Sequence, residues 1–590
     1  MAGDNDGAKA KSRLKQIASQ IQSPNKNHGN TSTAPPERQA AKRTRRKDKN
    51  APPADWSDIL GQVEAVKKIA ETPPTDRPGY VRQKQAGKLW VRERIDAFLD
   101  PGSFYEVGSV AGTIDWRTTT AGKDGKAKDE VRGFTPSNNV QGFGTVGGRR
   151  VLFTADDFSL RAGHADGAIW AKTVYMERLC LDLRLPIVKL VDGSSGGGSV
   201  TTIMKDGFSY VPPTPGFREV AEQLSLGIPN VGAVLGPAIG LGAARVTACH
   251  FSVMASDVGS LFNAGPHVVA KATFEEGLTV GELGGPEIHC ANGTIDNAVP
   301  DEAACFAQIR KFISYVPDCG LNHLPPVAEA IDPSDRGVKS LRTIIPRRRQ
   351  RAYSMLRLIQ TTLDQDSWFE IGAGWGNTAF VGLGRMGGQP VGVVANNPEV
   401  LSGATDALGA QKMIRHLNLC DVFNLPLIQF VDCPGYAVGT AAERQATMKY
   451  GVELGKAYYS TTMPIFNVLV RKCYGVAGGL MVDCREPHNR VAWPSLESGS
   501  LPLEGGIEAS HSRELKDAGE KRAELYENLM NDYTRLQNPV RTAAAFSVPE
   551  IIDPADTRRL LCAWTTHMYR VKLPERLRDR QSGKIHPVFR

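Results

Sequence analysis

Paired cysteines are the first feature that this 590-residue sequence lacks. Its ten cysteines are scattered, with no CxxC pair and no zinc-finger spacing. Such spacing is typical of structural zinc sites and thioredoxin-like redox motifs. We therefore expect reduced thiols in an intracellular protein, and no metal site.

Long apolar runs are also missing. The most extended uncharged stretch of note, residues 223–244, contains two prolines and five glycines, which makes it a poor membrane-spanning helix. No hydrophobic signal segment begins the sequence, and Asp4 and Asp6 among the first basic residues argue against a transit peptide. We expect no membrane association and no secretion. The cytoplasm and the mitochondrial matrix both remain open as compartments.

A net basic charge is absent from most of the chain, although the whole sequence carries +8. Residues 1–50 hold 12 Lys/Arg against 4 Asp/Glu, and the remainder holds 59 of each sign. The folded part therefore has no overall bias toward polyanions, and no nucleic-acid partner is expected. Residues 1–53 are predicted to be a disordered basic tail.

An internal repeat is the most informative feature present. Gly142–Asp192 aligns without gaps on Gly382–Asp432 at an offset of 240, with 15 of 51 positions identical. The matches include turn glycines, strand ends and Lys172/Lys412. Each copy alternates strands and helices, which predicts an α/β fold that has been duplicated, with the join near Pro325–Pro346.

Glycine clusters follow two apolar strands in each copy. The expected strands are 187–191 and 231–235, then 425–431 and 465–470; turns are expected at 192–199, 236–242, 432–440 and 474–479. Helices are expected at 84–99, 165–183, 219–226, 405–423 and 441–460, with a strand at 104–110 and a polar surface insertion at 112–137. Lys172 and Lys412 are expected on solvated helix faces. Asp192 and Asp432 are expected to orient the loops that follow their strands.

These residues together resemble a known family, the carboxyltransferase (beta) subunits of biotin-dependent acyl-CoA carboxylases, which act on propionyl-CoA or 3-methylcrotonyl-CoA. The resemblance extends from about Tyr80 to the C-terminus. The stretches that carry it are Arg92-Glu93-Arg94-Ile95, LDPGSF (99–104), Asp156-Asp157-Phe158, GELGGPEIH (281–289), NNPEVLSGA (396–404), FVDCPGYAVGT (430–440) and RKCYG (471–475).

The resemblance implies two tandem crotonase-like (ClpP/crotonase) domains. Residues 54–330 would form the N-terminal domain, on the acyl-CoA side, and residues 331–590 the C-terminal domain, on the biotin side. It implies backbone donors at Gly240 and Leu241 for the thioester oxygen, and at Val476 and Ala477 for the biotin ureido oxygen. The implied substrate-binding residues are Gly163, Ser195, Gly196, Gly197, Pro434, Gly435 and Gly479.

Carboxyl transfer explains why such loops would suffice. Charge develops on the thioester oxygen and on the ureido oxygen, and the freed biotin nitrogen can take the α-proton. No side-chain base is then required, and two facing sets of backbone donors stabilise both charges. Gly479 has no side chain, which suggests room for a longer or bulkier acyl group.

Two further motifs of biotin carboxylases are missing. The chain has no biotin-attachment Met-Lys-Met and no ATP-binding glycine loop followed by Lys-Ser/Thr. Biotin and ATP use are therefore expected on a partner, a biotin carboxylase or biotin carrier subunit. The resemblance also implies a dimer-based homo-oligomer, up to a hexamer.

Alternative functions stay open at this point. The loops depart from the family pattern at Leu241, Val476, Ala162-Gly163-His164 and the segment 193–199. One alternative is an acyl-CoA decarboxylase or transcarboxylase of the same fold, because the sequence does not set the direction of transfer. The other is a catalytically silent scaffold subunit.

Overall fold

The computed structural model describes residues 55–121, 126–164, 167–195, 200–214, 216–349 and 351–589. The predicted disordered tail, residues 1–53, and the predicted substrate-binding Gly196 and Gly197 lie outside these ranges. Contacts divide the chain into two units, Met1–Ile59 and Leu60–Arg590. The three sheets of the described residues all belong to the second unit. Residues 60–330 are called the first half and residues 331–589 the second half; a domain boundary at 330 stays a prediction.

The first half is built around an eight-stranded sheet with strand order β1-β4-β5-β6-β7-β8-β10, in which β9 also pairs with β7. Strand β4 runs antiparallel to both of its neighbours, β1 and β5, and β5 to β8 run parallel. The strands are β1 (Tyr105–Glu106), β4 (Asn139–Val146), β5 (Arg149–Asp156), β6 (Ile187–Gly193), β7 (Asn230–Ile239), β8 (Phe251–Ala255), β9 (Ser260–Phe262) and β10 (Asn297–Val299).

The second half repeats this topology in a seven-stranded sheet, ordered β11-β12-β13-β14-β15-β16, in which β17 also pairs with β15. Its strands are β11 (Phe369–Glu370), β12 (Ala379–Met386), β13 (Gln389–Asn396), β14 (Leu427–Cys433), β15 (Ile465–Tyr474), β16 (Arg490–Ala492) and β17 (Glu497–Gly499). The register repeats too: Ile187 pairs with Asn230 as Leu427 pairs with Ile465. The predicted α/β class and the predicted duplication are both confirmed.

Helices connect the parallel strands and cover the sheets. The first half contains α3 (Pro78–Gln85), α4 (Val91–Phe98), α5 (Trp170–Leu183), α6 (Val200–Asp206), α7 (Phe217–Leu226), α8 (Leu241–Thr247), α9 (Pro266–Ala272), α10 (Val280–Gly284), α11 (Pro286–His289) and α12 (Glu302–Tyr315). The second half contains α13 (Met355–Thr362), α14 (Ala407–Phe423), α15 (Thr440–Arg444), α16 (Thr447–Ser460), α17 (Gly475–Val482), α18 (Leu503–Ser510), α19 (Ser512–Asp517), α20 (Arg522–Leu536), α21 (Pro539–Ala544), α22 (Thr557–His567) and α23 (Leu573–Gln581).

Local sequence explains the ends of α14. The Asp406 side chain accepts a hydrogen bond from the Gly409 N–H, as an N-cap does. Asn424 adopts the left-handed conformation that ends the helix. Its side chain then donates to the Gly320 carbonyl at 2.7 Å, so this cap also joins the second half to the first.

Several predicted elements have different bounds. The single helix expected over residues 84–99 is two helices, because α3 ends at Gln85, Gly87 has φ 75° and α4 begins only at Val91. The strand expected over 104–110 is limited to β1. The surface insertion is a hairpin of β2 (Gly112–Ala121) and β3 (Lys126–Pro136).

Predicted turns around the glycine clusters are also shorter than expected. Strand β7 continues to Ile239 and α8 starts at Leu241, so the turn over 236–242 reduces to Gly240. Likewise β15 continues to Tyr474, and α17 occupies most of the turn expected over 474–479. The helix expected over 441–460 is split into α15 and α16, with Ala446 left-handed between them.

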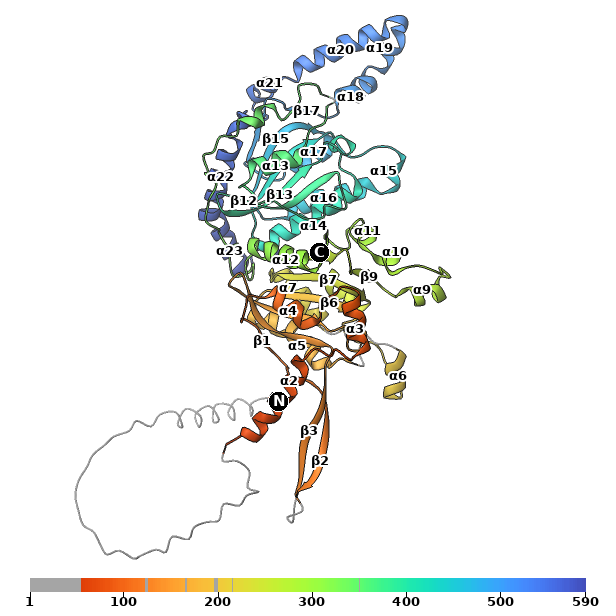
Figure 1. Cartoon of the computed structure of the whole chain (residues 1–590). Helices are drawn as coiled ribbons and strands as arrows, with labels where there is room; N and C mark the ends of the chain where they lie inside the picture. Colours follow the sequence, from red (N-terminus) through yellow and green to blue (C-terminus); the bar gives the residue numbers. More distant parts are fainter. Residues whose placement is uncertain are drawn as a thin grey trace, which may run out of the picture. The chain divides into compact units, whose positions relative to one another are not determined.

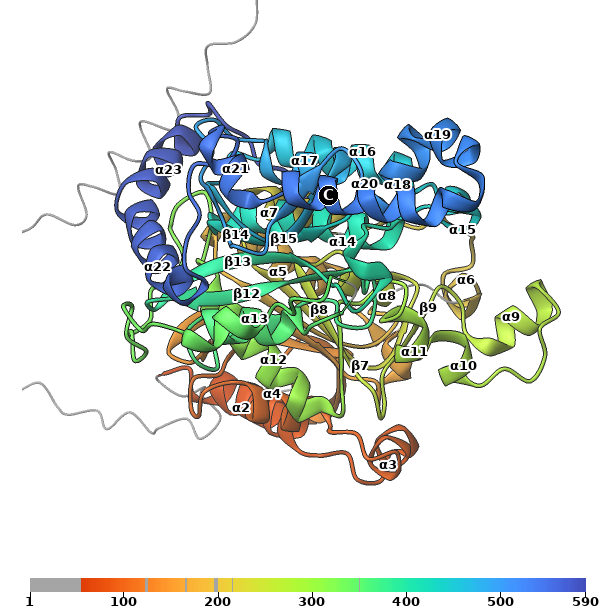
Figure 2. The same ribbon diagram turned by 90° about the horizontal axis from the view of Figure 1, so that it is seen from above.

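The C-terminal helices tie the molecule together. Helix α22 packs against β12 and β13 (Figure 1). In α23, Arg580 donates to the Val422 carbonyl at 2.6 Å and to the Ser225 carbonyl at 3.0 Å, which joins both halves. Helices α18 to α20 lie side by side around their own small apolar cluster (Figure 2). None of the helices in the described ranges is long and apolar enough to cross a membrane.

Candidate functional site

The loop after β6 packs tightly against two neighbouring segments. A Cβ added to Gly163 would come within 3.2 Å of the Gly193 Cα, so the 161–163 turn touches the loop at main-chain distance. A Cβ on Gly242 would collide with the Gly193 carbonyl oxygen and lie 3.2 Å from Ser195 Oγ. The structure therefore brings together Gly163, Ser195 and the first turn of α8, and their assignment to the acyl-CoA side stays a prediction.

Gly240 forms the junction between β7 and α8. Its φ of 54° and ψ of −107° lie where glycine is favoured over other residues. The first N–H groups of a helix have no intrahelical acceptor, so the amides of Leu241 and Gly242 can bind an external anion. The N–H of Gly240 donates to the Phe262 carbonyl at 3.1 Å. This bond is at odds with the predicted donor role of Gly240, which serves instead as the turn.

The second half has an equivalent junction between β15 and α17. Gly475, with φ 60°, takes the place of Gly240, and Val476 therefore matches Leu241. Val476 is 68% exposed, whereas Ala477 is buried. The two predicted donor pairs therefore do not occupy equivalent positions. Val476 and Ala477 correspond to Leu241 and Gly242, whereas the pair predicted for the first half is Gly240 and Leu241.

Open space surrounds two predicted substrate-binding glycines of the second half, Gly435 on the biotin side and Gly479, which is expected to affect acyl-chain size. A Cβ added to Gly435 or to Gly479 would meet no atom within 4 Å. Pro434 lines a cavity of about 260 Å³ together with Lys472 and Tyr474. The space at Gly435 and Gly479 leaves room for a ligand beside the second loop. The cavity beside Pro434 also includes charged side chains, namely Arg349, Arg351, Arg471, Lys472, Glu497 and Glu504.

A buried aspartate ends the central strand of each half. Asp192 accepts from Lys88 Nζ at 2.7 Å and from Arg94 Nη1 at 2.8 Å. Asp432 pairs with Arg471 Nη2 at 2.9 Å and accepts from the Tyr353 hydroxyl at 2.9 Å. Both carboxylates are paired with buried cations, and the role predicted for them, orienting the loops that follow, stays a prediction.

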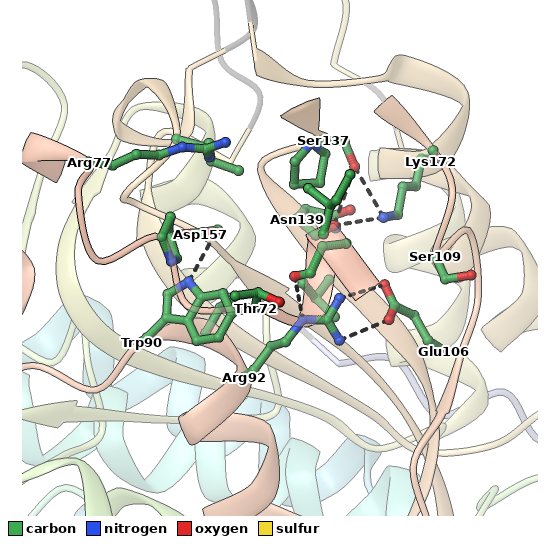
Figure 3. A pocket seen from close by; sticks show the side chains of 18 residues that line it. Thr72, Arg77, Trp90, Arg92, Glu106, Ser109, Ser137, Asn139, Asp157 and Lys172 are labelled. Carbon is green, nitrogen blue, oxygen red and sulfur yellow. Dashed lines mark hydrogen bonds and ion pairs between the residues drawn. The ribbon is translucent and has the colours of Figure 1, made fainter. Parts of the chain in front are cut away.

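Lys172 and Lys412 contradict the expectation of solvated helix faces. Lys172 Nζ donates to Ser137 Oγ at 3.1 Å and to the Asn139 carbonyl at 2.8 Å, and it points inward among the residues of Figure 3. Lys412 Nζ donates to the Trp375 and Ala379 carbonyls at 3.0 and 2.9 Å. Burial lowers the pKa of each amine to about 8. Both lysines tie a helix to the start of a strand, which explains their match in the repeat.

Sequence reasoning missed several residues that hold these loops. Arg94 and Asp156 lie within stretches that suggested the family, yet no role was predicted for either. Arg94 also binds Glu302 Oε2 at 2.6 Å and is fully buried. Burial raises the pKa of the Asp156 carboxyl. A buried charge beside a turn glycine is the signal that could have identified them.

Comparison with known proteins supports the same interpretation. A family profile described as the carboxyl transferase domain matches residues 82–580. The chain is 32% identical over 485 residues to the human mitochondrial propionyl-CoA carboxylase beta chain, covering 81% of this chain and 85% of that one. It is 30% identical over 513 residues to the methylmalonyl-CoA carboxyltransferase 12S subunit of Propionibacterium freudenreichii subsp. shermanii, covering 86% and 93%.

A solved structure is similar over nearly the whole length. It is the transcarboxylase 12S crystal structure, described with its hexamer assembly and with methylmalonyl-coenzyme A and methylmalonic acid bound. The TM-score is 0.74 at 27% identity, covering 88% of this chain and 97% of that chain.

Proposed function

Since the chain belongs to the carboxyl transferase family and is an acyl-CoA carboxyltransferase with two crotonase-like halves, we propose that its first half binds the acyl-CoA and its second half binds carboxybiotin. The observation that supports one binding position in each half is the repeated junction of strand, glycine and helix. Gly240 precedes α8 and Gly475 precedes α17, each with positive φ. Each half thus presents free amides at one position.

The first junction stabilises the acyl-CoA during proton loss. Removing a proton from the α-carbon places negative charge on the thioester oxygen. The N–H groups of Leu241 and Gly242 bind that oxygen, while the Gly240 N–H remains on the Phe262 carbonyl. One such donor contributes about 3–4 kcal/mol to stabilising a transition state.

The second junction holds the donor of the carboxyl group. Biotin, carried on a partner subunit, supplies the carboxyl group in activated form. The N–H groups of Val476 and Ala477 bind its ureido oxygen, and Pro434 and Gly435 flank the ring. Because α17 buries Ala477 and leaves Val476 exposed, the ring approaches over the first turn of the helix.

Partners and assembly follow from the same family. We propose a biotin carboxylase and biotin carrier subunit as partners, and a homo-oligomer built from dimers, with the hexamer of the 12S relative as the expected size. The protein would act in the cytoplasm or the mitochondrial matrix, in keeping with its mitochondrial and bacterial relatives.

The direction of transfer has a second candidate. The 30% identity to a methylmalonyl-CoA carboxyltransferase subunit favours considering a transcarboxylase, in which an acyl-CoA also donates the carboxyl group. Carboxyl transfer measured in both directions, from carboxybiotin and from methylmalonyl-CoA, separates the two.

Calorimetric titration is the first test of the acyl-CoA side. The purified protein is titrated with acetyl-, propionyl-, methylcrotonyl- and a long-chain acyl-CoA, with free CoA as the reference. We expect binding graded by the acyl group. No binding to any of the four would contradict the acyl-CoA role and favour the scaffold alternative.

A matched pair of variants tests the donor assignment. Leu241→Pro deletes one amide N–H at the first helical position, where proline is tolerated, and Leu241→Ala keeps it. We expect kcat for carboxyl transfer to fall about 10²–10³-fold in the first and to change little in the second. Equal effects of the two variants would disprove the Leu241 donor.

A further inference from the structure

A buried cluster of charges lies beneath α8 in the first half. It contains Asp156 at the end of β5, Glu177 on α5, Lys189 on β6 and Arg245 on α8, each less than a tenth exposed. Glu177 Oε1 lies 3.5 Å from Lys189 Nζ and 3.7 Å from Arg245 Nη2. Arg245 Nη1 lies 3.8 Å from Asp156 Oδ1. Helix α8, which carries the proposed donors, is therefore held by the pairing of its Arg245 with Asp156 and Glu177.

The other oxygen of Asp156 holds the loop after β6. Ser195 Oγ donates to Asp156 Oδ2 at 2.5 Å, and the Asp192 backbone N–H donates to the same oxygen at 3.2 Å. Ser195 has φ 50°, a conformation that costs free energy for a residue with a side chain and persists only where contacts enforce it. The hydrogen bond to Asp156 supplies such a contact.

One carboxylate thus connects the two parts of the proposed acyl-CoA site. The loop and the helix also touch directly, because Gly242 has no room for a Cβ between the Gly193 carbonyl and Ser195. A shift of either part would change the direction of the Leu241 and Gly242 amides. Errors of about 1 Å in such positions can lower a rate about 10²-fold.

The second half lacks this charged arrangement. By the register of the repeat, Asn396 replaces Asp156, Leu417 replaces Glu177, Gln429 replaces Lys189 and Leu480 replaces Arg245. Asn396 Oδ1 still accepts from the Asp432 N–H at 3.2 Å, but Gly435 stands in place of Ser195 and offers no hydroxyl. The hydrogen bond to the backbone N–H at the strand end is therefore present in both halves. The hydrogen bond from the loop hydroxyl is present in the first half and has no equivalent at Gly435.

We infer that Asp156 is a positioning residue for the acyl-CoA side, where it fixes the Ser195 loop against α8 and so aims the amides that bind the thioester oxygen. This role rests on the proposed function of α8. Asp156 itself does not touch the substrate. The second half achieves its geometry without a charge, so the carboxylate is a feature of the first site alone.

Three variants test the inference through carboxyl-transfer kinetics. Asp156→Ala removes both links, and we expect kcat to fall about 10²-fold with KM for the acyl-CoA within about threefold. Ser195→Ala cuts only the loop link and should lower kcat about tenfold, by the same reasoning. Asp156→Asn, which copies the second half, should restore most of the activity lost in Asp156→Ala. Asp318→Asn, at an ion pair with Arg149 away from both loops, is the control and should match the unmodified protein.

Amide hydrogen exchange provides a readout that does not depend on activity. In Asp156→Ala and Ser195→Ala, exchange should rise in two separate peptides, one spanning 192–195 and one spanning 240–247. The matched variant Asn396→Ala should raise exchange only in the second half. If the unmodified protein transfers no carboxyl group, the proposed function fails, and the exchange data still decide the positioning role.

Other outcomes would overturn the inference. Unchanged exchange in 240–247 for both variants would show that Asp156 does not fix α8. A rise in KM with unchanged kcat would show a role in ground-state binding instead. If Asp156→Ala does not fold, Ser195→Ala, which removes a single hydroxyl, decides the matter by the same criteria.

Discussion

The two halves meet the same structural requirement with different residues. Each must neutralise the buried aspartate at the end of its central strand. In the first half Lys88 and Arg94 reach Asp192 from segments before the sheet, and a Cβ at Gly236 would collide with that carboxylate. In the second half Arg471, at the position equivalent to Gly236, reaches Asp432 from the neighbouring strand.

This difference shows what a duplicated fold preserves. The strand end and the aspartate persist in both halves, and each aspartate is paired with a buried cation. The source of positive charge is free to move, since any buried cation of suitable reach satisfies the carboxylate. The halves are therefore equivalent in backbone and distinct in their buried charges.

The largest expected effect comes from breaking the first charge network. Arg94→Met leaves Glu302 without its guanidinium and Asp192 with Lys88 alone. Removing one partner of a buried pair typically costs about 3–5 kcal/mol, so we expect a loss of that size in denaturant unfolding. Arg471→Met leaves the buried Asp432 with two neutral donors, the Tyr353 hydroxyl and the Lys472 N–H, so we expect a loss of similar size. A negligible loss for either variant would contradict the comparison.

The next effect concerns the spacing between loop and helix. Gly242→Ala adds a Cβ where the Gly193 carbonyl lies, whereas the equivalent Ala477 already carries one. We expect Gly242→Ala to lower kcat about 10²-fold by shifting the loop. Ala477→Gly should change kcat far less. Carboxyl-transfer kinetics on both variants check this, and a similar loss in both would remove the distinction.

A smaller effect is expected at Gly479, beside the open space of the second half. Gly479→Leu should lower kcat/KM for longer acyl-CoAs about tenfold relative to acetyl-CoA, because the new side chain fills the space for the acyl group. Competition between acetyl- and longer acyl-CoAs measures the ratio. A strong preference of the unmodified protein for acetyl-CoA would contradict the hypothesis that Gly479 leaves room for a longer acyl group.

A last effect, on stability instead of catalysis, is a pH dependence at Lys172. Its pKa falls from 10.5 to about 8 on folding, so between these values the unfolded chain binds more protons. The contribution of Lys172 to the free energy of unfolding is therefore lowest below pH 8. It rises as the pH increases toward 10.5, by up to about 1.4 kcal/mol per pH unit. Unfolding of Lys172→Met and of the unmodified protein, compared at pH 7 and pH 9.5, measures the difference. A gap that does not change with pH would disprove the shift.

Local rules explain the part of the fold that the sequence predicts well. The strand–loop–helix order and the repeat follow from turn glycines such as Gly147 and Gly387, which have positive φ in both halves. The same rules failed where tertiary contacts decide. Residues 86–90 interrupt an otherwise helical pattern, because the Trp90 indole N–H binds Asp157 at 3.3 Å and α4 starts only after it.

The sequence predicted which loops form the candidate site, but it did not predict the hydrogen bonds and the burial of the side chains around them. Gly163, Ser195 and Leu241 were named and lie together, whereas Gly240 was assigned a donor that is already bound. Lys172 and Lys412 were matched as repeat positions, but their burial was not foreseen. A lysine in a helical pattern reads as solvent-exposed unless the acceptors that enclose it are known.

The duplicated α/β fold, the family and the positions of the turn glycines can be predicted from the sequence. These depend on glycine conformation and apolar periodicity, which act over a few residues. Which amides are already hydrogen-bonded and which buried charges pair depends on how distant segments pack together. Arg94 and Asp192 are 98 residues apart in the chain, and their 2.8 Å contact depends on the packing of the whole first half.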